Sequence, residues 1–244
     1  MANLHGKNYL GKNIPAMSRF MKLLITMVLC VGCEESKTQM QLALREFEAG
    51  SKLFTRALHY QMMESDSMVA PAREARIHLL TAFAASGNDP QFALMLPNAY
   101  DLMGAHDSAY YWEKRFYELD SARGRSSREQ AEGSFRSMAH SCLFLGDSVR
   151  LKYCLLRLRQ LGPAPGGPNE GVWDGLNYII FYSKSRASIA LRAKGIKPCA
   201  FGLSMLDYFR TLYADRLADF DHSYPPEAIS HAKKECAAAP NSSE

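Results

Sequence analysis

The sequence predicts an all-α protein built from antiparallel helical hairpins, arranged as an α-solenoid or as an irregular helical bundle. Three patterns predict this class. Strand-type alternation is nearly absent, apolar residues recur at helical spacing, and Gly, Asp and Pro interrupt the helical segments at regular intervals. Short helices joined by tight turns pack against their neighbours in the chain, which produces a bundle or a solenoid.

The expected helices follow from their breaks. Gly104 and Gly146 are typical residues after a helix end, and Asp107 and Asp147 are typical caps of the next helix. Pro198 is suited to a helix start. The sequence predicts helices at about 37–64, 71–86, 90–103, 107–120, 127–145, 148–161, 172–194, 198–219 and 225–237.

Apolar stripes support these assignments. In the 148–161 segment Leu151, Leu155 and Leu158 fall on one face. Stripes of this kind belong to helices buried against other helices.

Size and composition exclude several protein classes. The chain has 244 residues, of which 47% are hydrophobic and 22% charged, as in ordinary folded domains. Disordered, collagen-like and small cysteine-rich chains are therefore excluded. No apolar run reaches the roughly 18 residues of a spanning helix, which excludes a multi-pass membrane protein.

The positive charge is confined to the N-terminal segment. The net charge of +4 comes from 29 basic and 25 acidic residues. Residues 1–32 hold Lys7, Lys12, Arg19 and Lys22 and no acid, so residues 33–244 are balanced at 25 of each sign. Because phosphate neutralisation supplies most nucleic-acid affinity, we expect no nucleic-acid partner.

Residues 17–36 have the organisation of an export signal. A short basic region is followed by an uncharged, mostly apolar run from Leu23 to Gly32, and then by Cys33 and two acids. This pattern resembles the lipobox of bacterial lipoproteins. The resemblance implies that residues 1–32 are a signal region, that the chain is cut after Gly32, and that Cys33 is acylated as the new N-terminus. Residues 1–16 fit no signal, so we expect translation to start at Met17 or Met21. A plain cleaved signal and an ordinary buried first helix are the alternatives.

Two segments resemble tetratricopeptide repeats, in which small and aromatic residues at set places let paired helices pack closely. The matching residues are Leu96, Tyr100, Gly104 and Ala109 in 90–120, and Ala139, Gly146, Leu155 and Pro163 in 128–163. Trp173 and Leu176 have the spacing that opens a third unit. The resemblance implies helical hairpins over 33–162 and further helices over 169–236 on the same array. Residues 237–244 are expected to be a mobile tail, because chain ends are often poorly ordered. A generic helical bundle with recurrent Gly-Asp turns is the alternative.

No catalytic constellation is evident. Zinc, phosphate-loop, dinucleotide and nucleophile-elbow motifs are absent. Glu74 and His78 stand four residues apart, but a surface ion pair is the simpler interpretation. We therefore predict no catalytic residue, no metal ligand and no cofactor.

Aromatic residues crowd the 107–120 segment and cannot all face one core. Tyr and Trp are favoured at protein interfaces, because they bury a large area at low entropic cost. We take Tyr110, Tyr111, Trp112 and Tyr117 as candidate partner-binding residues.

Four cysteines remain outside the signal region: Cys142, Cys154, Cys199 and Cys236. They allow three pairings in an oxidising compartment. A Cys142–Cys154 bridge is conceivable, and buried free thiols are the alternative.

Together these patterns predict a lipid-anchored scaffold or adaptor of the bacterial cell envelope. It is tethered to a membrane through Cys33 and binds another envelope protein through its helical surface. One alternative is an enzyme or small-ligand binder with a site between two lobes near 162–168. The other is a cytosolic helical adaptor whose first apolar segment belongs to the core.

Overall fold

A computed structural model describes residues 19–63, 65–162, 176, 179–180, 185–216 and 226–238. Side chains are described from Ser36 onward, apart from some in the last helix. The helices are α1 (Arg19–Met62), α2 (Val69–Ala85), α3 (Leu96–Leu102), α4 (His106–Ala122), α5 (Arg128–Leu145), α6 (Ser148–Leu161), α8 (Arg186–Ala193), α9 (Pro198–Leu212) and α11 (Pro226–Ala238). Three short 3-10 helices are η1 (Asp66–Met68), η2 (Pro90–Ala93) and η3 (Ala214–Arg216). These residues include no strand, so the predicted all-α class is confirmed.

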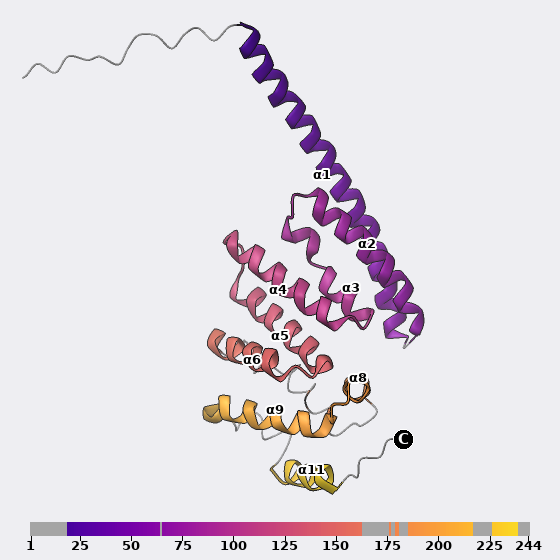
Figure 1. The fold of residues 1–244 in the computed structure, drawn as a ribbon, viewed down its shortest axis with the longest axis vertical. Helices are drawn as coiled ribbons and strands as arrows, with labels where there is room; N and C mark the ends of the chain where they lie inside the picture. The colour runs from indigo at the N-terminus through magenta and orange to yellow at the C-terminus, as the bar shows by residue number, and fades with distance from the viewer. Residues whose placement is uncertain are drawn as a thin grey trace, which may run out of the picture.

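Consecutive helices pack antiparallel and form a stack that runs from α1 to α11 (Figure 1). Contacts also join some helices that are not consecutive: α1 touches α3, α5 touches α8, and α6 touches α9. An ion pair between Arg150 and Asp107 joins α6 to α4 at 3.0 Å. The stack therefore has two layers, with α3 and α5 in one and α4, α6 and α9 in the other.

Among the described residues, two apolar clusters fill the interior. The first holds Phe54, Leu79, Phe83 and Leu96, from α1, α2 and α3, with Trp112 of α4 packed against it. The second joins α5, α6, α8, α9 and α11. Its fully buried side chains include Phe135, Met138, Leu143, Leu151, Leu155, Leu158, Leu191 and Phe209. The helix α4 contributes to both clusters and so links the two halves of the stack.

Most predicted turns have their expected chemistry. Gly146 ends α5 with φ of 69°, a left-handed conformation that glycine adopts without steric cost. The carboxylate of Asp147 then caps α6 by accepting hydrogen bonds from the N–H groups of Val149 and Arg150. Ser127 and Gln130 form a capping box at the start of α5.

Asp107 was expected to cap the fourth helix, and this prediction is wrong. Ala105 occupies the cap position without a side-chain hydrogen bond, and Asp107 lies in the first turn of α4. Its carboxylate instead accepts a hydrogen bond from Arg150 of α6. The contact with Arg150 therefore engages the side chain of Asp107, which local capping rules predicted at the start of the helix.

Four predicted helices differ in extent. The 198–219 segment is helical only to Leu212, where α9 ends before Tyr213 and η3. The 90–103 segment divides into η2 and α3, because Pro97 lacks the N–H of a helix interior and suits the first turn of α3. The 172–194 segment is interrupted at Ser185, whose extended backbone and hydroxyl cap α8. The first helix begins at Arg19 rather than near 37, so its backbone includes Cys33. Figure 1 shows the N-terminal part of α1 extending beyond the rest of the stack.

Candidate partner-binding groove

A groove of about 610 Å³ lies between α4 and α6. Its lining residues are Asp107, Tyr110, Tyr111, Lys114, Val149, Arg150 and Tyr153. On α4 the lining positions 107, 110, 111 and 114 recur at three- and four-residue spacing, which keeps them on one helix face. The groove therefore lies between one face of α4 and the adjacent face of α6, two neighbouring helices of one layer.

Large apolar side chains are exposed at this groove. Tyr111 is 59% exposed, Val149 76% and Tyr153 48%, and Leu156, one turn further along α6, is 41% exposed. Single exposed apolar residues are common on folded proteins, but an adjoining set beside a concavity is typical of an interaction site.

Arg150 organises one wall of the groove. Its guanidinium lies 3.0 Å from the Asp107 carboxylate and 3.3 Å from that of Asp147, and it covers the ring of Tyr110 at 4.9 Å. The hydrogen bond to Asp107 raises the pKa of Arg150 further, so the side chain stays charged. Burial raises the pKa of Tyr110 to about 12, so the phenol stays neutral. The wall thus offers a fixed cation and an uncharged ring.

The structure separates the four aromatic candidates of α4. Tyr110 and Tyr111 line the groove. Trp112 is half-buried and packs edge-on against Phe83 of α2, with ring centroids 5.3 Å apart. Tyr117 packs on Phe135 of α5 at 5.1 Å. Trp112 and Tyr117 therefore join helices internally, because their positions on the wheel of α4 face the two apolar clusters.

Sequence reasoning missed the contribution of α6. The helix α6 has a buried apolar stripe, formed by Leu151, Leu155 and Leu158. A second, exposed face of the same helix carries Val149, Tyr153 and Leu156. A second apolar stripe at helical spacing was the signal that could have identified this face.

A smaller, polar pocket of about 330 Å³ lies between α3 and α5, with Ala109 of α4 at its base. Its polar lining residues are Asn98, Asp101, Arg136, Ser137, His140 and Ser141. Asp101 is the centre of a polar group, since the Nδ1 atoms of His106 and His140 lie 2.7 Å and 4.0 Å from its carboxylate. His106 also stacks on Phe144, with ring centroids 4.3 Å apart.

Burial would raise the pKa of Asp101, but the hydrogen bond from His106 and the nearby positive groups outweigh it and lower the pKa. Glu113 of α4 behaves in the opposite way. Burial raises its pKa, although the hydroxyls of Ser134 and Ser137 partly stabilise the carboxylate.

The remaining predicted sites lie elsewhere. The side chain of Cys33 is outside the described residues, as are residues 163–175, which include most of the predicted division between two lobes. His78 pairs with Glu46 of α1 at 2.7 Å rather than with Glu74. Within the described ranges, no group of three or more His, Cys, Asp or Glu side chains is arranged so that it could hold a metal ion, and no helix has the length and hydropathy needed to cross a membrane.

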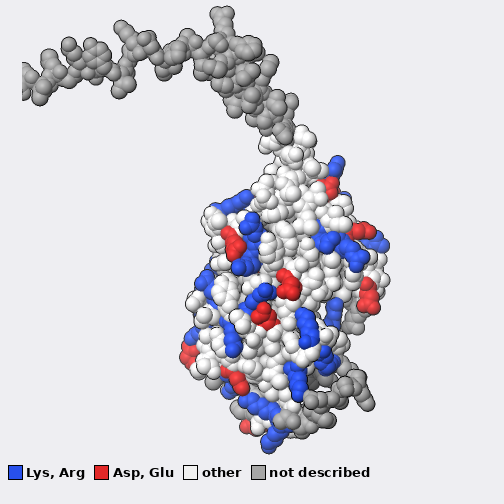
Figure 2. All heavy atoms as spheres, viewed as in Figure 1, with Lys and Arg blue, Asp and Glu red and all other residues white. Residues whose placement is uncertain are grey.

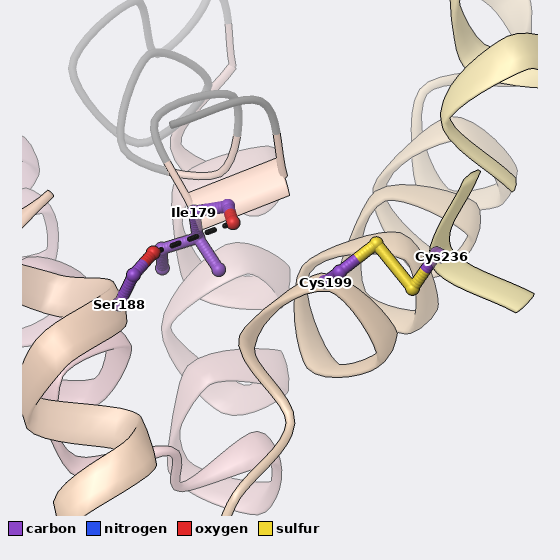
Figure 3. Close-up of a disulfide and its surroundings, with 4 residues drawn as sticks. All are labelled: Ile179, Ser188, Cys199 and Cys236. Carbon is purple, nitrogen blue, oxygen red and sulfur yellow. Dashed lines mark hydrogen bonds between the residues drawn. A yellow bond between two sulfur atoms is a disulfide. The ribbon is translucent and has the colours of Figure 1, made fainter. Parts of the chain in front are cut away.

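The cysteines form one disulfide, and the conceivable Cys142–Cys154 bridge is not formed. Cys199 in the first turn of α9 forms a disulfide with Cys236 of α11 (Figure 3). Cys142 and Cys154 are buried free thiols in the second apolar cluster. A hydrogen bond to Cys154 and burial raise the pKa of Cys142, so this thiol stays protonated. Beside the disulfide, the hydroxyl of Ser188 donates a hydrogen bond to the carbonyl of Ile179 at 3.4 Å (Figure 3).

Comparison with known proteins adds no relative: no protein-family model, no curated protein and no solved structure matches this chain.

Proposed function

We propose that this protein is a lipid-anchored adaptor of the bacterial cell envelope, which binds another envelope protein through the groove between α4 and α6. The observation that carries the proposal is the set of exposed side chains around the groove, namely Tyr111, Val149 and Tyr153. Aromatic side chains beside a concavity are the usual anchors of protein interfaces.

The disulfide supports an envelope location. Disulfides persist in oxidising compartments such as the bacterial periplasm and are rare in the reducing cytosol. The Cys199–Cys236 bridge therefore fits export, as the lipobox-like segment before Cys33 requires.

The stacked hairpins support a binding role. Ala109, Ala139 and Leu155, which match tetratricopeptide positions, are buried between helices. Helical-repeat proteins use extended surfaces of stacked hairpins to hold other proteins. The adaptor role thus agrees with the architecture and with the three tyrosines that line the groove.

Site-specific photo-crosslinking in the native envelope tests partner binding. A photoreactive residue at Tyr111 should yield a discrete crosslinked product, whereas the same residue at Ile189 of α8, also exposed, should not. Absence of a product at Tyr111, or an equal product at both positions, would contradict the proposed groove.

Mass spectrometry of the chain purified from membranes tests the anchor. We expect an N-terminal Cys33 carrying diacylglycerol, and release of the Cys33→Ser variant from the membrane fraction. Several acyl chains anchor a protein firmly, whereas one binds only marginally. An unlipidated chain that starts at Met1, Met17 or Met21 would instead favour a cytosolic adaptor.

The polar pocket between α3 and α5 supports a second candidate, a small-ligand binder. Its carboxylate, imidazole and hydroxyl groups converge from neighbouring helices. A metabolite screen by thermal shift tests this function. The Asp101→Asn variant should abolish any ligand-induced rise in Tm, while a variant at exposed Asp66 should preserve it.

A further inference from the structure

The outer face of α6 carries an apolar stripe framed by cations. Val149, Tyr153 and Leu156 stand at i, i+4 and i+7, so they lie on one side of the helix, and all three are exposed. At 100° per residue, Lys152 and Arg159 fall on one flank of this stripe and Arg150 and Arg157 on the other. The helix from Ser148 to Leu161 contains no acidic residue.

Neighbouring rings hold these cations in place. The charged groups of Arg150 and Arg157 cover the rings of Tyr110 and Phe135, at 4.9 and 5.4 Å from the ring centroids. On the other flank, Lys152 covers Tyr208 at 5.2 Å and Arg159 covers Tyr213 at 5.3 Å. Stacked side chains lose less entropy when a partner binds, because their positions are already restricted.

The stripe and its cations favour one kind of occupant. We infer that the groove binds an amphipathic α-helix of the partner, with apolar residues facing the stripe and acidic residues on both flanks. A helix matches the linear stripe through its own i, i+3 and i+4 positions, and its carboxylates match the two rows of cations. The inference rests on the proposed function and specifies the chemistry of the partner.

A flat anionic membrane is the other surface that a basic amphipathic helix can bind. The groove argues against it, because a cavity of about 610 Å³ beside the stripe accepts inserted side chains.

Two fluorescent helical peptides test the inference. Both carry Leu at i, i+4 and i+7, and their flanks carry Glu in one peptide and Lys in the other. We expect the Glu peptide to bind at least about tenfold more tightly, and its affinity to fall as salt is added. Val149→Glu and Leu156→Glu should abolish binding. Ile77→Glu, a change at a similarly exposed apolar residue of α2, should leave it unchanged.

Charge reversal provides the sharper test. The Lys152→Glu variant should weaken the Glu peptide and strengthen the Lys peptide, because an electrostatic preference changes sign with the charge. Lys152 is exposed, and circular dichroism checks that the variant remains folded.

The outcomes separate the two proposals. Equal binding of both peptides, no binding of either, or binding only to phosphatidylglycerol vesicles overturns the acidic-helix inference. If the Tyr111 crosslink persists in these cases, the proposed adaptor function stands with a partner of different chemistry. If that crosslink is also absent, the adaptor function falls as well.

Discussion

Glu113 and Asp101 are both partly buried carboxyl groups, yet their pKa values shift in opposite directions. Burial raises the pKa of Glu113, whereas the hydrogen bond from His106 and nearby positive groups lower that of Asp101 despite burial. Glu113 of α4 forms hydrogen bonds with side chains of α5. The structure shows how the chain accommodates it, through the hydroxyls of Ser134 and Ser137.

The Glu113→Gln variant should be more stable than the wild type at pH 7. Because the pKa of Glu113 is raised in the folded state, ionisation of its carboxyl destabilises the fold at pH values above the pKa of the unfolded state, which is about 4.3. This cost is relieved as the pH falls through the folded-state pKa, so the advantage of Gln should shrink toward pH 4. Urea unfolding at several pH values measures it, with Glu118→Gln on the exposed face of α4 as the control. A constant difference at all pH values would show that ionisation is not the cause.

The Asp101→Asn variant should show the opposite dependence. Because the pKa of Asp101 is lowered in the folded state, its carboxylate stabilises the fold at pH values above the pKa of the unfolded state, which is about 3.9. This stabilisation is lost as the pH falls through the folded-state pKa. The variant should therefore be less stable than the wild type at pH 6, and the two should converge in acid. Thermal unfolding from pH 6 to pH 2 checks this, and Asp66→Asn should leave the wild-type profile unchanged. Parallel profiles of Asp101→Asn and the wild type would refute the prediction.

At the scale of elements, two helical glycines have different reasons to be present. Gly50 of α1 faces α2, where an added Cβ would lie 2.9 Å from Leu79 Cγ and 3.2 Å from the carbonyl oxygen of Ala75. Gly133 of α5 has no neighbouring atom within 4 Å of that position. Alanine improves helix propensity at both sites but creates a steric conflict at only one.

We expect the free energy of unfolding of Gly50→Ala to lie about 1–3 kcal/mol below that of Gly133→Ala, because overpacking opposes the gain in helix propensity. Gly133→Ala should exceed the wild type by about 0.5–1 kcal/mol. Denaturant unfolding of the two variants measures both differences. Equal stabilisation by both substitutions would show that α1 and α2 have room to separate.

The disulfide is also a property of elements, since it fixes α11 to the start of α9. The bridged cysteines are separated by 37 residues in the chain. Removing a bridge over such a loop should cost about 4 kcal/mol in the chain-entropy model. The double variant Cys199→Ser and Cys236→Ser should thus unfold at lower denaturant, whereas reducing agent should not affect it further. Reactive thiols at Cys199 and Cys236 after unfolding without reductant would contradict the pairing.

At the scale of the molecule, the described core begins some way along α1. The first buried side chain described is Ala43, and Figure 1 shows the preceding part of α1 extending beyond its neighbours. A chain that begins at residue 33 should therefore keep the Tm of the full chain, as differential scanning calorimetry would show. A marked loss of Tm would mean that residues 19–32 belong to the core, as in the cytosolic alternative.

The charge distribution also belongs to this scale. Lys and Arg side chains are spread over the visible face of the stack with Asp and Glu between them (Figure 2). The apolar stripe of α6 and its flanking cations are therefore distinguished by where these side chains lie on the helix, and not by the net charge of the protein. Composition alone could not have identified it.

The sequence by itself determined the all-α class, most helix boundaries and most turns. These depend on local effects, such as apolar spacing along one helix, the left-handed conformation of Gly146 and the cap at Asp147. Tertiary structure alone decided which cysteines pair, which aromatics of α4 are exposed and that α6 completes the groove. Each of these depends on which helix lies beside which, and side chains distant in the chain, such as Asp107 and Arg150, become neighbours only after the helices have packed.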